Sequence, residues 1–216
     1  MNTIVIENEI FHLLPDRAIF WPRVATLFVA DLHWGKTATF RAAGLALPGG
    51  EAEDLARLGR LITATGASRV VILGDLLHAR SGRNEQVFNE IAAWREQQAT
   101  EMLLVRGNHD QRAGDPPADW RITVVDAPFV MEPFVLHHYP QEDARGYVLA
   151  GHLHPHALLR GGGRQHLKLP CFWFGSRVGV LPAFGGFTGT AAIAPAAGDR
   201  VFIIADDSVI ERTVSE

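Results

Sequence analysis

The sequence predicts an α/β fold in which a parallel sheet is followed by a second sheet. Three short apolar runs, at residues 26–30, 69–73 and 101–105, alternate with two amphipathic segments. Such alternation of strands and helices favours parallel pairing with right-handed crossovers. Beyond residue 121 the apolar runs are short, are separated by Gly and Pro and lack helical periodicity, which indicates a largely antiparallel second sheet. Because the chain shows no linker or internal repeat, we expect one domain over residues 1–216.

The two helices are predicted from the spacing of apolar side chains. Residues 51–65 place Leu55, Leu58 and Ile62 at intervals of three and four, which puts them on one helix face. Residues 84–98 repeat this pattern after a Ser-Gly turn. Two further strands are expected in the second half of the chain, at residues 134–136 and 147–150.

Composition and charge exclude several classes of protein. A chain that is 47% hydrophobic and 20% charged has the balance of a folded globular protein, not of a disordered one. The net charge of −4 excludes a protein that coats nucleic acid but leaves room for a local basic cleft. The single Cys171 allows no disulfide within the chain, and the first ten residues lack the pattern of a signal peptide. We therefore expect a soluble, cytoplasmic protein with no membrane partner.

Polar side chains with metal-binding chemistry follow all five predicted strands. Parallel strands place their carboxyl ends at the same edge of a sheet, so these side chains are expected to converge there. The candidate donors are Asp31, His33, Asp75, Asn108, His137 or His138, His152 and His154. His137 and His138 are neighbours in sequence, and successive strand residues point to opposite faces, so only one of the two is expected to face the site.

The donor types predict the kind of ion. Imidazoles mixed with carboxylate and amide oxygens suit Mn, Fe or Zn better than Ca or Mg, and the absence of Cys from the set excludes a zinc finger. The donors outnumber what one ion needs. We therefore predict two divalent ions about 3.5–4 Å apart that share a carboxylate and hold a hydroxide for attack. Two such ions against two carboxylates leave a positive site, which would stabilise the charge that develops during phosphoryl transfer.

The ordered motifs Asp-x-His, Gly-Asp, Gly-Asn-His-Asp, a strand-end His and Gly-His-x-His span residues 31–154. This set resembles the calcineurin-like metallophosphoesterase superfamily. The resemblance implies a four-layer αββα sandwich with mixed sheets around a dinuclear centre, with Mn²⁺ as the first expectation and Fe or Zn as alternatives. It implies His138 as the strand-end ligand in place of His137. One ion would take Asp31, His33, Asp75 and His154, and the other would take Asp75, Asn108, His138 and His152.

The same resemblance implies roles for two further residues. His109 corresponds to a histidine that binds no metal and that orients the phosphate or protonates the leaving oxygen, and Asp110 would tune it. Imidazole suits a general acid that works near neutral pH.

A finer resemblance covers most of the chain. Residues 30–44, 169–175 and 181–189 are similar to the ligase-associated DNA-repair phosphoesterases. This implies a DNA endonuclease of DNA-damage repair that acts beside an ATP-dependent DNA ligase and a helicase. Two alternatives stay open. The acidic charge favours a phosphodiesterase of small substrates such as cyclic nucleotides, and a third hypothesis is a metal-binding scaffold without catalysis.

The remaining candidates lie near the strand ends or near the C-terminus. Lys36, Arg41 and Arg106 are candidates for phosphate contacts, and Trp34 is expected either to stack on a base or to cover the ions. His78 is interpreted as a supporting partner of a ligand or as a plain loop residue, and His137 as a packed or supporting residue. The aromatic residues Phe172, Trp173, Phe174, Phe184 and Phe187 are expected in the core, or, if exposed, at a homodimer interface.

Overall fold

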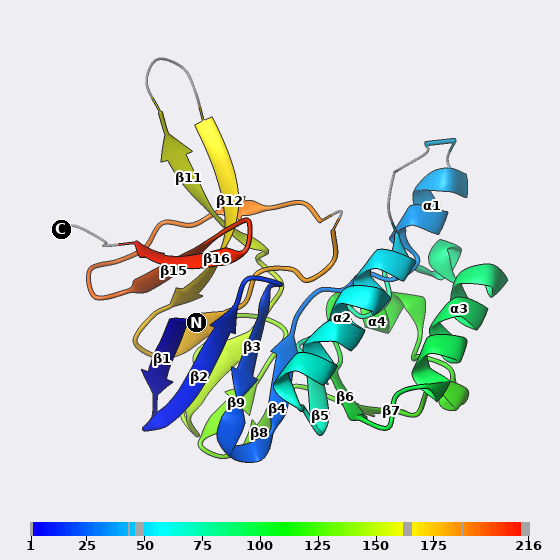
Figure 1. Cartoon of the computed structure of the whole chain (residues 1–216), viewed down its shortest axis with the longest axis horizontal. Coiled ribbons are helices and arrows are strands. Elements are labelled where there is room, and N and C mark those ends of the chain that lie inside the picture. The colour runs from blue at the N-terminus through cyan, green and yellow to red at the C-terminus, as the bar shows by residue number, and fades with distance from the viewer. Residues whose placement is uncertain (1, 43, 46–49, 162–165, 187, 213–216) are drawn as a thin grey trace.

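The computed structural model describes residues 2–42, 44–45, 50–161, 166–186 and 188–212 of the chain. Two mixed sheets face each other, and the helices lie beside the first of them (Figure 1). This confirms an α/β fold with two mixed sheets. In the described residues no α-helix follows α4 (Asn108–Ala113), so a helical layer on the outer face of the second sheet is not observed there. The physical reason is the sequence beyond residue 121, which lacks the apolar spacing that a surface helix needs.

The first sheet has the order β1-β2-β3-β4-β5-β6-β7. Strands β1 to β4 pair antiparallel, and β4 to β7 pair parallel as the sequence predicted for the central strands. The antiparallel start was not predicted. The strands are β1 (Asn2–Ile6), β2 (Glu9–Leu14), β3 (Ala18–Trp21), β4 (Thr26–Val29), β5 (Arg69–Ile72), β6 (Glu101–Val105) and β7 (Ile122–Val125).

The helices connect the parallel strands. Helix α2 (Glu51–Thr65) has the predicted bounds and ends at Gly66, which adopts the left-handed conformation. Helix α3 (Glu85–Glu96) begins after Asn84, whose side chain accepts hydrogen bonds from two backbone N–H groups of the first turn. Two short helices, α1 (Lys36–Ala42) and α4, were not predicted. Single 3₁₀ turns lie at Pro22–Val24, Arg80–Gly82 and Ala118–Trp120.

The second sheet has the order β14-β11-β12-β13-β10-β9-β8, with β15 paired to β12 and β16. Strand β10 pairs parallel with both β9 and β13, whereas the β12 pairings are antiparallel. The strands are β8 (Phe129–Met131), β9 (Phe134–Leu136), β10 (Tyr147–Ala150), β11 (Pro155–Arg160), β12 (His166–Phe174), β13 (Val178–Val180), β14 (Ala191–Ala192), β15 (Arg200–Ala205) and β16 (Ser208–Arg212).

Two apolar cores hold the layers together. Between the sheets, Phe11, Phe28 and Phe134 are completely buried and belong to one cluster. Between the first sheet and its helices, Leu58 and Ile91 are completely buried in a second cluster. Each such side chain stabilises the fold by about 1.5–3 kcal/mol relative to leaving it exposed. The packing fixes the two sheets against each other, and with them the ends of β4, β5, β9 and β10.

The aromatic residues near the C-terminus are mostly core residues, as expected. Phe172, Phe174 and Phe184 are buried, and Trp173 is half-buried. Phe187 lies outside the described residues. None of the helices in the described part of the chain is long and apolar enough to cross a membrane.

Candidate metal centre

The candidate donors follow directly after strands of both sheets. The first sheet supplies donors after β4, β5 and β6, and the second supplies them after β9 and β10. Because all these strands end at the same side of the molecule, residues more than 100 positions apart in sequence come together. The residues brought together are Asp31, His33, Asp75, Asn108, His138, His152 and His154.

Five of these donors adopt a left-handed backbone conformation. Their φ angles are Asp31 54°, His33 52°, Asp75 52°, His152 69° and His154 48°. For residues with a Cβ atom this conformation is strained by about 1–3 kcal/mol each and tends to occur at functional sites. The strain turns the chain sharply after the strand and directs both side chains and backbone N–H groups to the centre.

Two glycines allow the donors to approach one another. A Cβ atom at Gly107 would overlap Asp75 Oδ1, and a Cβ atom at Gly74 would overlap the His138 ring. Gly74 also has a φ of +84°, a conformation that residues with side chains rarely adopt. Glycine is therefore required at both positions if the donors are to converge.

The first donor group consists of Asp31, His33 and His154. His33 Nε2 lies 3.4 Å from His154 Nε2, which in turn lies 3.4 Å from Asp31 Oδ1. His154 Nδ1 donates to the carbonyl oxygen of Gly189 at 2.7 Å, which leaves the lone pair of Nε2 facing the group. Asp31 Oδ2 accepts the backbone N–H of His152 at 2.8 Å. Three donor atoms thus surround one small volume.

The second group consists of Asp75, Asn108, His138 and His152. His138 Nε2 lies 3.0 Å from Asn108 Oδ1, 3.1 Å from His152 Nδ1 and 3.4 Å from Asp75 Oδ2. His138 Nδ1 donates to the carbonyl oxygen of Leu73 at 3.1 Å. This bond fixes the tautomer in which Nε2 offers its lone pair to the group.

Asp75 lies between the two groups. Its Oδ2 atom is 3.4 Å from His138 Nε2 in the second group and 3.9 Å from His33 Nε2 in the first. Its Oδ1 atom accepts the backbone N–H of His109 at 2.9 Å. A carboxylate in this position can serve both groups at once, which is how two cations share a ligand.

The electrostatics of the centre reflect two buried carboxylates that need positive charge. Burial opposes protonation of His154, but Asp31 outweighs it, so the pKa of His154 is raised. Burial acts in the same way on His138, where Asp75 outweighs it and the pKa is again raised. His33 is the exception, because burial lowers its pKa to about 2. The carboxylates of Asp31 and Asp75 thus favour positive charge on His154 and His138.

The residues present fit divalent cations. Asp31 is completely buried, and its Oδ1 atom has no hydrogen-bond partner in the described residues. Asp31, His33 and His154 each offer a ligand atom within 4.8 Å of the others, and so do Asp75, His138 and His152. Buried carboxylates are stable only when they are paired or coordinate a metal. His138 and His154 each donate from Nδ1 to a backbone carbonyl oxygen, which is the arrangement typical of metal-binding histidines.

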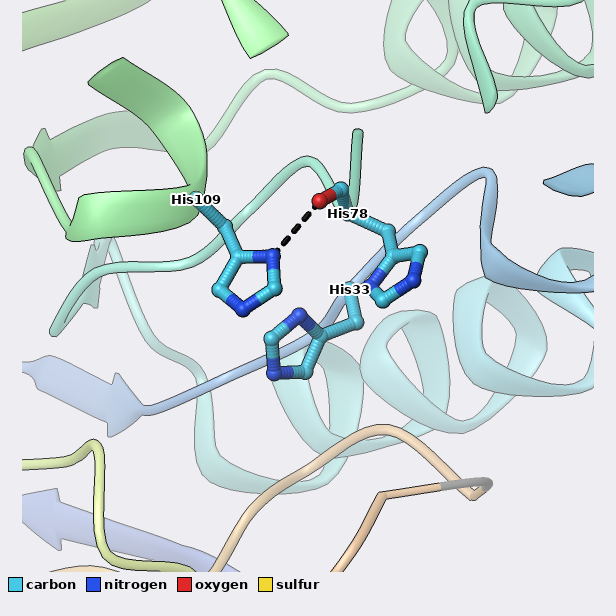
Figure 2. Close-up of side chains that lie close together, drawn as sticks. All are labelled: His33, His78 and His109. Carbon is cyan, nitrogen blue, oxygen red and sulfur yellow. Dashed lines mark hydrogen bonds between the residues drawn. The ribbon is translucent and has the colours of Figure 1, made fainter. Parts of the chain in front are cut away.

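His109 and His78 lie beside the first donor group (Figure 2). His109 Nδ1 donates to the carbonyl oxygen of His78 at 2.6 Å, which leaves Nε2 4.0 Å from Asp75 Oδ2. The His78 ring stacks on the His109 ring, with centroids 5.2 Å apart, and on the other side faces Phe40. Burial lowers the pKa of His78 to about 4, with further lowering by Lys36 and His109. His78 thus orients His109 through its backbone and its ring.

Asp110 differs from the sequence expectation. Its oxygens accept the backbone N–H groups of Leu77 and Gly107, each at 2.9 Å, and do not bind the His109 ring. Burial raises the pKa of Asp110 to about 6. The expected tuning of His109 by Asp110 therefore has no direct hydrogen bond behind it among the described residues. Asp110 instead connects the loop after β5 to the start of α4.

His137 faces away from the centre. Its Nε2 atom lies 3.4 Å from Asp143 Oδ2, and its Nδ1 atom accepts from Gln141 at 3.4 Å. The side chain is buried. His138, not His137, is therefore the residue that the end of β9 directs into the donor group.

The candidate substrate residues are placed in different ways. Lys36 begins α1, is half-buried and lines a small cavity together with His33. Arg41 is exposed in the last turn of α1. Arg106 binds Asp115 at 3.0 Å and also Asp126, so its charge is already neutralised and the expected phosphate contact is corrected. Trp34 is 1% exposed, and both expectations for it, stacking on a base and covering the ions, are wrong because its ring packs in the core under the helices.

Sequence reasoning missed the residues that hold the donors in place. Glu51 is buried, and its carboxylate accepts from Gly35 N at 2.8 Å and from Thr37 Oγ1 at 2.7 Å, which fixes the turn after His33. The Tyr139 ring covers His152, with centroids 4.4 Å apart. Glu51 carried a usable signal, since a carboxylate in the first turn of a predicted helix is often a capping residue.

The family model and one solved structure relate this chain to known phosphoesterases. The model of the calcineurin-like phosphoesterase family matches residues 25–169. The solved structure of the nuclease MPE from Pseudomonas putida is 42% identical, with 98% of this chain and 99% of that chain covered and a TM-score of 0.88. A phosphoesterase from E. coli, Yfce, is 17% identical, with 88% of this chain and 99% of that chain covered and a TM-score of 0.37. No curated protein matches.

Proposed function

The chain belongs to the calcineurin-like phosphoesterase family, and from this premise we propose that it is a nuclease that hydrolyses DNA phosphodiesters. Membership makes it a metal-dependent hydrolase of phosphoester bonds. The proposal depends on the position of Asp75 Oδ2, which lies between two separate groups of nitrogen and oxygen donors. The choice of DNA is supported by the 42% identity to a nuclease over nearly the whole chain.

Two divalent ions would be held by the two donor groups. Asp31, His33 and His154 would bind one ion, Asn108, His138 and His152 would bind the other, and Asp75 would bind both. Ions in such a pair lower the pKa of bound water and withdraw charge from phosphoryl oxygens. The chain itself fixes the orientation of His138 and His154, through the carbonyl oxygens of Leu73 and Gly189.

We assign proton transfer to His109. Its Nδ1–H is held by the carbonyl oxygen of His78, so only Nε2 is free to face a substrate in the centre. The side chain is one-third exposed, which gives it access to a leaving oxygen at the surface of the site. In the protonated form, Nε2 can donate its proton to that oxygen as the phosphorus–oxygen bond breaks. Lys36, close to the rings of His33 and His78, adds positive charge on the same side.

A phosphodiesterase of small substrates such as cyclic nucleotides is the second candidate. The net charge of −4 favours it, because binding a DNA chain through many phosphates calls for clustered positive charge. Ionic strength separates the two candidates. Cleavage of a DNA chain weakens steeply with added salt, whereas turnover of a small diester does not.

The finer parts of the proposal are supported by the motif resemblance alone. They are Mn²⁺ as the natural ion, a role in DNA repair in the cytoplasm, and cooperation with an ATP-dependent DNA ligase and a helicase. Activity of the metal-stripped protein reloaded with Mn²⁺, Fe²⁺ or Zn²⁺ tests the first. Co-purification of the chain with a ligase from its own cells, compared between untreated and DNA-damaged cultures, tests the others.

A substrate panel tests the proposal. We expect single-stranded or plasmid DNA and bis(p-nitrophenyl) phosphate to be hydrolysed with added divalent ion, and no hydrolysis after chelation. Hydrolysis of the chromogenic diester and of cyclic nucleotides without DNA cleavage would favour the second candidate. A protein that binds ions but hydrolyses none of these substrates would contradict both and would support a scaffold.

A further inference from the structure

A second cavity, of about 180 Å³, adjoins the candidate metal centre. His154 belongs both to the first donor group and to the wall of this cavity. The volume is below the roughly 300–1,000 Å³ of sites that enclose a whole small molecule. The cavity is therefore suited to one chemical group of a larger ligand, the rest of which lies at the metal centre.

The lining of the cavity is basic and carries hydroxyl groups. Arg17, Lys168, Thr188 and Thr190 contribute to it, and none of the lining residues is Asp or Glu. Guanidinium, ammonium and hydroxyl groups are the donors that bind phosphate oxygens. In a chain with a net charge of −4, such a local concentration of positive charge stands out.

The two cations of the lining are not held in salt bridges by the part of the chain that the structure describes, although Arg17 feels the charge of Asp54. Arg17 is largely buried, and its Nη1 atom reaches only the carbonyl oxygens of Ala183 and Gly185, both at 3.4 Å. Lys168 is exposed on β12. Neither forms a salt bridge with any residue that the structure describes. An anion in the cavity could form a salt bridge with both.

His156 also lines the cavity, and its side chain carries a buried polar atom without a hydrogen-bond partner. The residue is 3% exposed, and its Nδ1 atom has no hydrogen-bond partner in the described residues. Buried polar atoms are paired in nearly all cases, and an unpaired one in a native structure calls for an explanation.

The cavity is tied to the metal centre through its backbone. The carbonyl oxygen of Gly189, between Thr188 and Thr190, accepts from His154 Nδ1 at 2.7 Å. The backbone N–H of Ala191 donates to the carbonyl oxygen of His154 at 3.2 Å. The threonine-bearing loop is thus held by the same residue that serves the first donor group. The distance between the two sites is fixed by this connection.

We propose that the cavity binds the phosphate group next to the scissile one in a DNA chain. This inference rests on the proposed function, because it needs a substrate with more than one phosphate. Lys168 and Arg17 neutralise the neighbouring phosphate, and the threonine hydroxyls donate to its oxygens. Binding of that phosphate sets the register of the strand across the metal centre and favours a DNA chain over an isolated diester.

Kinetics on two substrates test the subsite. For the Lys168→Ala variant we expect kcat/KM on a single-stranded oligonucleotide to fall about tenfold. For bis(p-nitrophenyl) phosphate, which has one phosphate only, kcat/KM should fall by no more than about twofold. Lys168→Arg should restore most of the loss on DNA. Arg60→Ala, which removes an exposed cation of α2 that does not line the cavity, serves as the matched control and should change neither substrate.

Binding to metal-stripped protein gives a second measurement. The salt dependence of oligonucleotide affinity, from fluorescence anisotropy, should lose about 0.7 in logarithmic slope in Lys168→Ala, as expected for one phosphate contact with a single strand. Arg17→Met should act in the same direction. Because Arg17 is largely buried, its variant is interpreted only if its thermal unfolding matches that of the wild type.

The outcomes separate this inference from the function on which it rests. Equal losses on both substrates, or no loss on DNA with an unchanged salt slope, would overturn the subsite while leaving the nuclease in place. Weaker inhibition of the small diester by inorganic phosphate in Lys168→Ala, with DNA cleavage unchanged, would mean that the cavity holds free phosphate instead, which also overturns it. A wild-type protein that hydrolyses the small diester but not DNA would remove the proposed function and the subsite together.

Discussion

The amino and carboxyl ends of the parallel strands differ in how their charged side chains are paired. At the amino ends lies a large cavity, of about 610 Å³, where Arg69 binds Glu101 at 2.9 Å and Arg95 donates to the carbonyl oxygens of Gln98 and Thr100, both at 2.7 Å. At the carboxyl ends the available space is smaller, but carboxylates and imidazoles face one another, and Asp31 Oδ1 and His33 Nδ1 have no hydrogen-bond partner in the described residues. The chemical site is therefore identified by donor side chains that converge on one small volume, and not by the size of a cavity.

The largest expected effect is at the carboxyl end. Replacing Asp75 by Ala removes the one carboxylate that lies between both donor groups, so we expect hydrolysis of every substrate to fall by more than about 100-fold, the upper range for residues that merely support a ligand. Metal content measured by plasma emission spectroscopy should fall as well. Asp119→Ala removes an exposed carboxylate that belongs to neither donor group and is the control. An Asp75→Ala protein that keeps both activity and metal would contradict the assignment.

His109 sharpens the comparison, because it acts on the substrate without holding a metal. In His109→Ala we expect DNA cleavage to slow by about 100-fold or more, the usual range for loss of a general acid. Bis(p-nitrophenyl) phosphate should be affected far less, because its leaving group departs without a proton. Metal content should stay at the wild-type value. Equal slowing of both substrates would argue for a different role.

Arg95 tests the amino end. It is 3% exposed and holds the loop that follows α3, so Arg95→Met should lower the free energy of unfolding by about 2–3 kcal/mol. Chemical denaturation measures this loss, with Arg60→Met as the matched exposed control. Because this end of the strands lies away from the donors, kcat/KM should be unchanged at a temperature where the variant is folded. A loss of activity without a loss of stability would break the contrast between the two ends.

The smallest expected effect is the release of protons from His138 and His154 when a metal ion binds. The pKa values of His138 and His154 are raised, because Asp75 and Asp31 favour the charged imidazoles more than burial opposes them. A metal ion needs the neutral imidazole, and binding must therefore expel the protons. Metal affinity should weaken as the pH falls through these raised pKa values.

Calorimetry in buffers of different ionisation enthalpy counts the released protons. We expect net proton release at about pH 6.5, and less release as the pH is raised through the elevated pKa values of the two imidazoles. Proton uptake on metal binding would contradict the charges assigned to the centre.

The central strands, both long helices and the convergence of the donors could be predicted because their signals are local. Helix 51–65 shows its apolar face in the sequence, and each donor follows an apolar strand directly. The short helices α1 and α4 carry too few residues to show a period. The fate of Trp34 and Arg106 depended on tertiary neighbours, a helix-covered core in one case and two distant carboxylates in the other. No pattern in the sequence reports such partners.

The most direct test of the account is the position of the metal ions. Crystals grown with Mn²⁺ and measured for anomalous scattering should show two peaks about 3.5–4 Å apart. Asp75 should lie between them, with His154 on one side and His138 on the other. A single peak, or peaks away from Asp75, would contradict the claim that the two donor groups form one dinuclear centre.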